Sequence, residues 1–302
     1  MSKPKVIVIC GPTASGKTAL SIKLAQQING EIVSADSMQI YKDMNIGTAK
    51  PTKEETQNIK HYLIDFVNPS QRYSVAEFKK DAEKAIEEIL SKGKIPIIVG
   101  GTGLYIDSLI YGIEYNEIKI DEKYRQQLEN RVEKEGLEKI YEEAKKIDYE
   151  ATQKISPNDK KRILRILEIY NATGKTKTEQ EIESKRNGIK YDYKVFAINL
   201  DREILYDRIN KRVDKMINEG LIQEVEEILK KYKEFPTAMQ GIGYKEVVEY
   251  LNGTITKEEM IDKIKQETRR YAKRQMTWFK KNKETIWIKS GDMQKILEEI
   301  DL

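Results

Sequence analysis

An eight-residue segment near the N-terminus constrains the fold more than any other part of the chain. Gly11-Pro12-Thr13-Ala14-Ser15-Gly16-Lys17-Thr18 follows the apolar run Val6–Ile9 and precedes a helical pattern over Ala19–Ala25. The glycines let backbone N–H groups close around an anion, and the positive end of the following helix points at the same anion. Lys17 adds a charge, and the Thr18 hydroxyl is a candidate magnesium ligand. The segment therefore predicts a strand, a loop that binds a di- or triphosphate, and a helix.

The composition is that of a globular protein. The 302 residues are enough for one large domain or two smaller ones, with 34% charged and 8% aromatic residues. No apolar run approaches the roughly 20 residues of a membrane span, and no signal-peptide pattern precedes the first strand. The single cysteine, Cys10, allows neither an intrachain disulfide nor a zinc finger. We therefore expect a cytoplasmic protein with no membrane partner.

The first third of the chain predicts an α/β fold. Apolar, β-branched runs at Lys5–Cys10, Glu31–Ser34, Tyr62–Ile64 and Ile95–Val99 alternate with helical patterns such as Ser74–Leu90. This alternation is typical of a mostly parallel sheet flanked by helices, with its ligand at the carboxyl ends of the strands. Together with the phosphate-binding loop, it indicates a P-loop NTPase-like, kinase-like core.

The pattern changes after about residue 114. Residues 115–190 are charged and helix-like, so we expect them to form a helical insertion domain, in which Ser156-Pro157-Asn158-Asp159 begins a helix with a capping serine. A strand over Tyr193–Leu200 then returns the chain to the sheet. The core domain should therefore consist of residues 1–114 and 191–302.

Positive charge gathers near the C-terminus. The window from Lys263 to Lys283, on a long predicted helix, holds nine basic residues against Glu267, so it carries +8 in a chain of net charge +4. Such a stripe on a mildly acidic body is the electrostatic footprint of a nucleic-acid-binding surface. A solvated helix face would produce the same pattern, and charge alone does not separate the two.

The second strong strand does not end in an acid. Motor ATPases and GTPases usually hold magnesium with a carboxylate at this position. Here Ile95–Val99 is followed by Gly100-Gly101-Thr102-Gly103, and Asp65 is a weaker substitute elsewhere. The glycine segment either brings N–H groups and a hydroxyl near the phosphates or is a plain strand-to-helix turn.

An acid and two arginines are further candidates for the site. Asp36 should lie at the carboxyl end of the strand Glu31–Ser34, where it is a candidate general base or a cap of the next turn. Arg208 and Arg212 share one face of a predicted helix. They either close over the phosphates, as in kinase-like folds, or form surface salt bridges.

Short motifs are spread along the whole chain, at Gly11–Thr18, Ser34–Lys42, Gly47–Pro51, His61–Asp65, Tyr73–Phe78, Gly100–Tyr105, Pro157–Asp159, Gln240–Glu246 and Arg274–Phe279. In this order they resemble the bacterial tRNA dimethylallyltransferases, also called tRNA isopentenyltransferases. Several motifs in one order are far more specific than any single motif. Eukaryotic relatives often carry a C-terminal zinc finger, for which this chain lacks the cysteines.

The resemblance implies a reaction. Dimethylallyl diphosphate donates its five-carbon group to N6 of the adenosine just 3′ of the anticodon, and diphosphate leaves. Asp36 would be the general base, and Lys17, Arg212 and a magnesium ion at Thr18 would stabilise the diphosphate. Thr102 would lie near the leaving group or the adenosine.

The resemblance also implies contacts with tRNA, whose target base must leave the stack of the anticodon loop. The matching residues are Asp36, Ser37, Met38, Gln39, Thr102, Lys160, Lys161, Arg162, Ile163 and Leu164. The basic residues Arg269, Arg270, Lys273 and Arg274 would hold phosphates of the anticodon stem-loop. We expect a monomer.

Three alternatives stay open at this point. A prenyltransferase acting on free adenine nucleotide would leave the insertion and the basic helix without a role. A phosphotransferase acting on a small metabolite would bind ATP at the same loop. A pure RNA-binding module would have no need of Lys17, Thr18 and Asp36.

Overall fold

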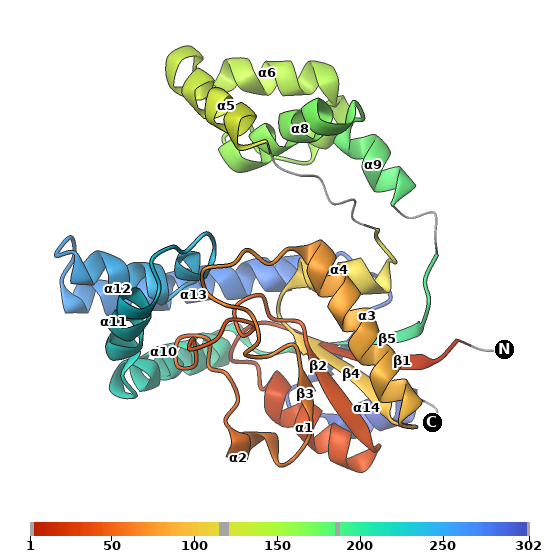
Figure 1. Cartoon of the computed structure of the whole chain (residues 1–302). Helices are drawn as coiled ribbons and strands as arrows, with labels where there is room; N and C mark the ends of the chain where they lie inside the picture. Colours follow the sequence, from red (N-terminus) through yellow and green to blue (C-terminus); the bar gives the residue numbers. More distant parts are fainter. Residues whose placement is uncertain (1–2, 115–120, 185–187, 301–302) are drawn as a thin grey trace. The chain divides into compact units, whose positions relative to one another are not determined.

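The computed structural model of the chain describes residues 3–114, 121–184 and 188–300. It contains two compact units, one made of Met1–Ile110 and Lys190–Leu302 and the other of Tyr111–Ile189 (Figure 1). Among the helices of the described ranges, none is long and apolar enough to cross a bilayer.

A six-stranded sheet forms the centre of the first unit. Its strands are β1 (Lys5–Cys10), β2 (Gly30–Ser34), β3 (His61–Tyr62), β4 (Ile95–Gly100), β5 (Asp192–Asn199) and β6 (Ile286–Lys289). Their order is β3-β2-β4-β1-β5-β6, and each neighbouring pair is parallel. The predicted parallel α/β sheet is confirmed. Because β4 lies between β1 and β2, the segments that follow these three strands meet at one edge.

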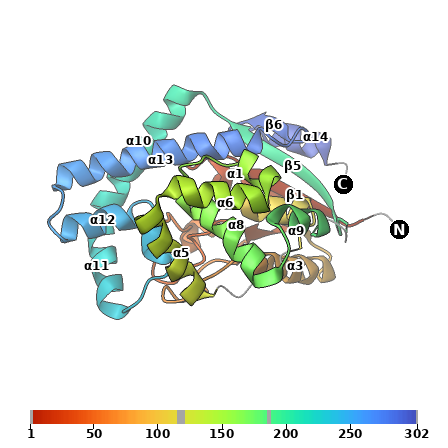
Figure 2. The same ribbon diagram turned by 90° about the horizontal axis from the view of Figure 1, so that it is seen from above.

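Helices cover both faces of this sheet, as Figures 1 and 2 show. The helices of this unit are α1 (Lys17–Gln27), α2 (Lys53–Thr56), α3 (Val75–Ser91), α4 (Gly103–Ile110), α10 (Arg202–Asn218), α11 (Leu221–Lys231), α12 (Tyr244–Leu251), α13 (Lys257–Phe279) and α14 (Met293–Glu299). Of these, α3 and α4 pack on one face of the sheet, and α1 and α14 pack on the other. Helices α10 to α13 pack with the loop after β2 around a further apolar cluster. That cluster lies next to the carboxyl edge of the sheet and closes the site described below.

The central strand β1 is buried on both faces, because its side chains alternate between two apolar clusters. Val6 and Val8 pack in one cluster with Phe78 of α3. Ile7 packs in the other with Leu24 of α1. Burying a side chain of this size stabilises the fold by about 1.5–3 kcal/mol.

The strand predicted at Tyr62–Ile64 is shorter and lies one residue earlier. It ends at Tyr62, because Leu63 and Asp65 have φ angles of 60° and 59°, which do not fit an extended strand. Asp65 is paired with Lys50 at 2.6 Å. The weaker magnesium candidate is therefore paired with a lysine of the loop before α2.

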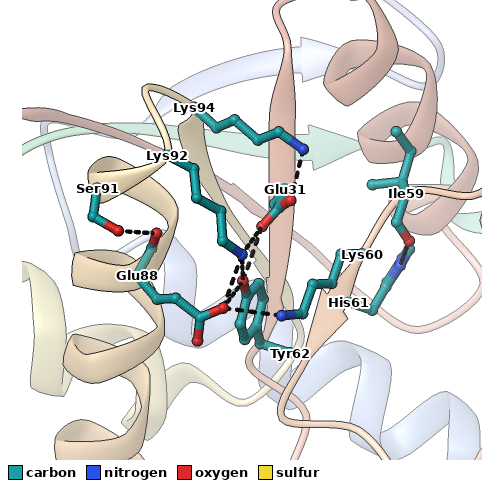
Figure 3. A network of polar contacts seen from close by, with 9 residues as sticks. All are labelled: Glu31, Ile59, Lys60, His61, Tyr62, Glu88, Ser91, Lys92 and Lys94. Carbon is teal, nitrogen blue, oxygen red and sulfur yellow. Dashed lines mark hydrogen bonds and ion pairs between the residues drawn. The ribbon is translucent and has the colours of Figure 1, made fainter.

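A polar network ties β2, β3 and α3 together at the amino-terminal edge of the sheet (Figure 3). The Tyr62 hydroxyl lies 2.9 Å from Oε2 of Glu31 and 2.8 Å from Oε1 of Glu88, and it accepts a hydrogen bond from Lys92 at 2.7 Å. Lys94 donates to Oε1 of Glu31 at 2.7 Å. The network lies at the edge of the sheet opposite the phosphate-binding loop.

The described part of the second unit is helical. Its helices are α5 (Glu122–Glu135), α6 (Leu137–Ile147), α7 (Tyr149–Gln153), α8 (Lys160–Thr173) and α9 (Lys177–Glu183). Leu128, Ile140 and Leu167 lie in its apolar core. Asp159, rather than the expected serine, caps α8: its Oδ1 atom accepts the N–H of Arg162 at 3.1 Å, so the helix begins at Lys160.

Candidate active site

The phosphate-binding loop lies between β1 and α1, as its sequence predicts. Helix α1 begins at Lys17, after Gly16 with a φ angle of 92°. The Nζ atom of Lys17 donates to the carbonyl oxygen of Pro12 at 2.7 Å. Burial, followed by the positive charge of Arg212, lowers the pKa of Lys17 to about 8, against the opposing effect of Asp36. A bound anion would favour the charged form of this lysine.

Asp36 follows β2, and its two carboxylate oxygens have different surroundings. Its Oδ1 atom accepts the N–H groups of Met38 at 2.9 Å and Gln39 at 3.2 Å, so it caps the turn. Among the described residues, no hydrogen-bond partner of Oδ2 is found, and Asp36 lines two cavities. The second oxygen is therefore available to a ligand.

Thr102 connects the glycine segment after β4 to the loop of Asp36. Its hydroxyl accepts the N–H of Ser37 at 3.0 Å and lies 3.3 Å from the Ser37 hydroxyl. Its own N–H donates to the carbonyl oxygen of Ala35 at 3.2 Å. Since that N–H is occupied, any N–H group that the glycine segment offers to phosphates comes from its other residues. Its hydroxyl positions the loop beside Asp36.

Arg208 and Arg212 both face the loop from α10. Arg212 donates to the carbonyl oxygen of Thr48 at 3.4 Å, and burial lowers its pKa despite the opposing charge of Asp36. Arg208 donates to the Ser290 hydroxyl at 3.4 Å, and Ser290 in turn donates to the carbonyl oxygen of Ser15. Both arginines line one cavity together with Lys17 and Thr18, and in the described ranges neither is found in a salt bridge.

Three cavities adjoin one another around Arg212, which lines each of them. The first, of about 730 Å³, contains Lys17, Thr18 and Arg208, and we call it the phosphate-side cavity. The bridging cavity, of about 70 Å³, is lined by Lys17, Thr18 and Asp36. The Asp36-side cavity, of about 320 Å³, lies beyond them. A basic chamber thus leads past the loop lysine to a carboxylate.

The start of α1 can accommodate a magnesium ion. Thr18 is exposed and lines both the phosphate-side and the bridging cavity. In the ranges that the structure describes, no group of three or more His, Cys, Asp and Glu side chains forms a metal site. Magnesium usually keeps several waters and shares the phosphates of its substrate, and the Thr18 hydroxyl is the protein group that could hold it here.

The residues expected to contact tRNA differ in exposure. Lys161 and Arg162 are exposed and Lys160 is partly exposed, all at the start of α8. Ile163 and Leu164 are 0% and 2% exposed and belong to the core of the helical unit. Their side chains therefore pack in the core, and the expectation that these side chains contact RNA is corrected. The reason is that a helix with its lysines on the exposed face turns Ile163 and Leu164 toward the buried face.

The loop residues Ser37, Met38 and Gln39 lie between the cavities. Ser37 and Met38 line the Asp36-side cavity, and Gln39 lines the bridging cavity. The Gln39 amide donates to the carbonyl oxygens of Thr48 and Ala49, both at 3.2 Å. The amide of Gln39 therefore holds the neighbouring loop.

The basic helix is less positive than its count of charges suggests. Lys265 pairs with Asp214 of α10 at 2.6 Å, and Arg270 with Glu267 at 2.6 Å. Lys263 pairs with Glu249 of α12, and Arg269 donates to Asn210 at 2.6 Å. Lys273 and Arg274 are exposed. The available charge therefore lies in the second half of α13.

Several side chains that hold the site were given no individual role from the sequence, although Gln275 lies within the motif Arg274–Phe279. They are Glu224, Tyr271, Gln275 and Ser290. Gln275 and Glu224 are buried polar residues within the apolar stripes of their helices. Gln275, for example, lies three residues after the buried Ala272 and four before the buried Phe279. A polar residue within an apolar helix face is the sequence sign that could have marked Gln275 and Glu224 as structurally important.

Comparison with known proteins agrees with this geometry. A family model described as IPP transferase matches residues 39–282. A tRNA dimethylallyltransferase of Acetivibrio thermocellus is 50% identical over 299 residues, which cover 98% of this chain and 96% of the relative. One of Carboxydothermus hydrogenoformans is 49% identical over 298 residues, again covering 98% and 96%.

Solved structures agree as well. The tRNA isopentenylpyrophosphate transferase of Bacillus halodurans matches with a TM-score of 0.72 and 41% identity, over 98% of this chain and 94% of that one. A eukaryotic dimethylallyltransferase described as acting on tRNA matches with a TM-score of 0.79 and 33% identity, over 99% and 76%. The resemblance seen in the motifs is confirmed, and the chain belongs to the IPP transferase family.

Proposed function

We propose that this protein transfers the dimethylallyl group of dimethylallyl diphosphate to N6 of the adenosine 3′-adjacent to the anticodon of tRNA, and releases diphosphate. The observation that carries the proposal is the series of cavities around Arg212, which joins Lys17 and Thr18 to Asp36. These cavities would let a leaving group at Lys17 and a base at Asp36 act from two sides on the same substrates. The family and the relatives named above support the same reaction.

The phosphate side stabilises the leaving group. When the bond between the allylic carbon and its oxygen breaks, both electrons go to the diphosphate. The N–H groups of the phosphate-binding loop, Lys17 and Arg212 face the charge that develops there. A magnesium ion held by Thr18 would add positive charge next to the same oxygens.

The Asp36 side activates the acceptor. The lone pair of the adenine N6 is delocalised into the ring, so N6 is a poor nucleophile until it loses a proton. As N6 forms its bond to the allylic carbon, the proton passes to Oδ2 of Asp36, while Oδ1 stays bound to the N–H groups of Met38 and Gln39. Ile209, Val213 and Ile242 give the Asp36-side cavity the apolar walls that suit a flat base.

The partner proposed for the remaining surface is the anticodon stem-loop. Lys160, Lys161 and Arg162 on the helical unit, with Lys273 and Arg274 on α13, offer cations to its phosphates. We further propose a monomer that acts in the cytoplasm. Light scattering of the purified protein with and without tRNA tests the oligomeric state.

The test is a donor assay with competing cosubstrates. The protein is incubated with unmodified tRNA and dimethylallyl diphosphate, in parallel with ATP in place of the donor and with AMP in place of tRNA. Mass spectrometry of the digested tRNA should find one adenosine heavier by a five-carbon group. A phosphorylated product in the ATP arm, with no prenylated tRNA, would establish the phosphotransferase alternative instead. Prenylated AMP without prenylated tRNA would establish a free nucleotide as acceptor.

A further inference from the structure

One buried amide joins the two loops that carry the chemistry of the proposed reaction. Gln275 of α13 is 5% exposed. Its Oε1 atom accepts the backbone N–H of Thr13 at 2.9 Å, and its Nε2 atom donates to the carbonyl oxygen of Gly101 at 2.9 Å. Thr13 belongs to the phosphate-binding loop after β1, and Gly101 follows β4. A single side chain therefore spans the carboxyl ends of two neighbouring strands.

A side chain at Gly101 would displace the amide of Gln275. A Cβ atom there would lie 2.1 Å from Nε2 of Gln275. Thr102 is the next residue, and its hydroxyl accepts the N–H of Ser37 beside Asp36. By fixing Gly101, Gln275 thus fixes the position of Thr102 relative to the phosphate-binding loop.

Gln275 is the middle one of three side chains of α13 that lie near the carboxyl ends of the strands. Tyr271 and Trp278 lie four residues before it and three after it, on the same helix face. The Nε1 atom of Trp278 donates to Oδ2 of Asp107 in α4 at 2.9 Å. Tyr271 lines the Asp36-side cavity together with Asp36, and burial, followed by the charge of Asp36, raises the pKa of Tyr271 to about 12.

An amide meets both partners of Gln275 at once. The N–H of Thr13 needs an acceptor, and the carbonyl oxygen of Gly101 needs a donor. A glutamate offers acceptors alone and a methionine offers neither, although both have nearly the same shape. The residue type is therefore set by its two partners and not by packing.

We propose that Gln275 is a positioning residue for the transfer reaction, which sets the separation between the loop that receives the leaving diphosphate and Thr102 beside the base. The inference rests on the proposed function. A change of about 1 Å in such a separation costs on the order of 100-fold in rate.

The experiment compares Gln275→Met and Gln275→Glu with Gln266→Met and Gln266→Glu. Gln266 is exposed on the same helix, so the second pair repeats each chemical change away from the loops. We expect the Gln275 variants to bind inorganic diphosphate with magnesium about 10-fold more weakly, the fold-change that corresponds to one lost hydrogen bond. Their KM for the donor should rise and kcat should fall on the order of 100-fold. Their affinity for tRNA should match that of the Gln266 variants.

The affinity for inorganic diphosphate distinguishes positioning from stability. A residue that only stabilises the fold lowers the fraction of active molecules, and leaves the dissociation constant and the donor KM unchanged. Values equal to those of the Gln266 variants would overturn the inference. If Gln275→Met does not fold, Gly101→Ala tests the same contact, because its methyl group would displace the Gln275 amide. This variant should also bind diphosphate more weakly. Unchanged binding would overturn the inference. Absence of transfer by the unmodified protein would refute the proposed function, while the diphosphate titration would still decide the role of Gln275.

Discussion

The hydroxyl of Tyr244 donates a hydrogen bond of 2.7 Å to Oε1 of Glu224. The same carboxylate accepts the N–H groups of Asn45, Ile46 and Gly47 at 2.8, 2.7 and 3.0 Å. Burial and then the charge of Glu224 raise the pKa of Tyr244 well above its usual range, so the phenol keeps its proton. A carboxylate of α11 thus holds the loop that leads to the phosphate-side cavity.

Glu224→Gln should destabilise the protein. The amide nitrogen would be placed against backbone N–H groups, so at least one buried donor loses its acceptor, at a cost of about 1–3 kcal/mol. Denaturant unfolding measures the change. Glu227→Gln, an exposed change on the same helix, is the control. Equal stability of the two variants would show that the carboxylate does not hold the loop.

Asp36→Asn should stop transfer and leave tRNA binding nearly unchanged. The asparagine oxygen still accepts the N–H groups of Met38 and Gln39, so the loop is kept while the base is lost. General-base catalysis contributes about 10²–10⁴ in rate, and single-turnover kinetics should fall by that factor. A large loss of tRNA affinity in a filter-binding assay would instead make Asp36 mainly a contact residue.

The affinity for the diphosphate donor should decrease as the pH rises through about 8. Burial, together with the charge of Arg212, lowers the pKa of Lys17 to about 8. In the protein without donor, Lys17 therefore loses its proton as the pH rises through this value. A bound diphosphate favours the charged ammonium and raises that pKa, and binding above pH 8 must therefore take up a proton. Calorimetric titrations on both sides of pH 8, in buffers of different ionisation enthalpy, measure this uptake.

Lys17→Met is the control for that experiment, since it removes the titrating group. The variant should bind the donor more weakly at neutral pH and lose the pH dependence. An unchanged pH dependence in the variant would assign it to another group.

Replacing Arg269, Arg270, Lys273 and Arg274 by glutamine should weaken tRNA binding and flatten its salt dependence. Each phosphate contact contributes a slope of about 0.7–0.9 in a plot of log K against log salt. Lys273 and Arg274 should account for most of the effect, because Arg270 is already paired with Glu267. Binding titrations at several salt concentrations provide the slopes. If the slope does not change, α13 is a solvated helix face.

Glu31→Gln should lower stability at neutral pH without changing donor affinity. Although burial raises the pKa of Glu31, hydrogen bonds from Lys94, Tyr62 and Lys92 lower it overall. A lowered carboxyl pKa stabilises the fold above the unfolded value of about 4.3, and this contribution is lost as the pH falls. We expect a loss of about 2 kcal/mol at neutral pH.

The control is Glu87→Gln, an exposed change on α3. The free energy of unfolding should differ between Glu31→Gln and the unmodified protein at neutral pH, and this difference should disappear at acid pH. A constant difference across this range would contradict the role assigned to the carboxylate.

Local signals in the sequence predicted the framework of the first unit and the place of its site. The strand, loop and helix around Lys17, and the acid after the second strand, have a spacing that follows from backbone geometry alone. The helix start before Lys160 was also visible, although Asp159 rather than Ser156 makes the cap. Such features depend on residues a few positions apart.

Contacts between distant residues could not be predicted in the same way. Gln275 meets Thr13 across 262 residues, and Lys265 pairs with Asp214 of another helix. Both contacts depend on how α13 packs on its neighbours. The side chains of Ile163 and Leu164 were misassigned for a related reason, since motif matching does not distinguish the buried face of a helix from its exposed face.

The position of β4 between β1 and β2 gives the active site a fixed length scale. Neighbouring strands are about 4.8 Å apart, so the ends of β1 and β2 are separated by about 10 Å. That interval is built from backbone hydrogen bonds, which no surface substitution can stretch. A family member that used a longer prenyl chain would therefore have to enlarge the cavities beside the sheet, because the spacing of the strands that precede the phosphate-binding loop and Asp36 cannot grow to fit it.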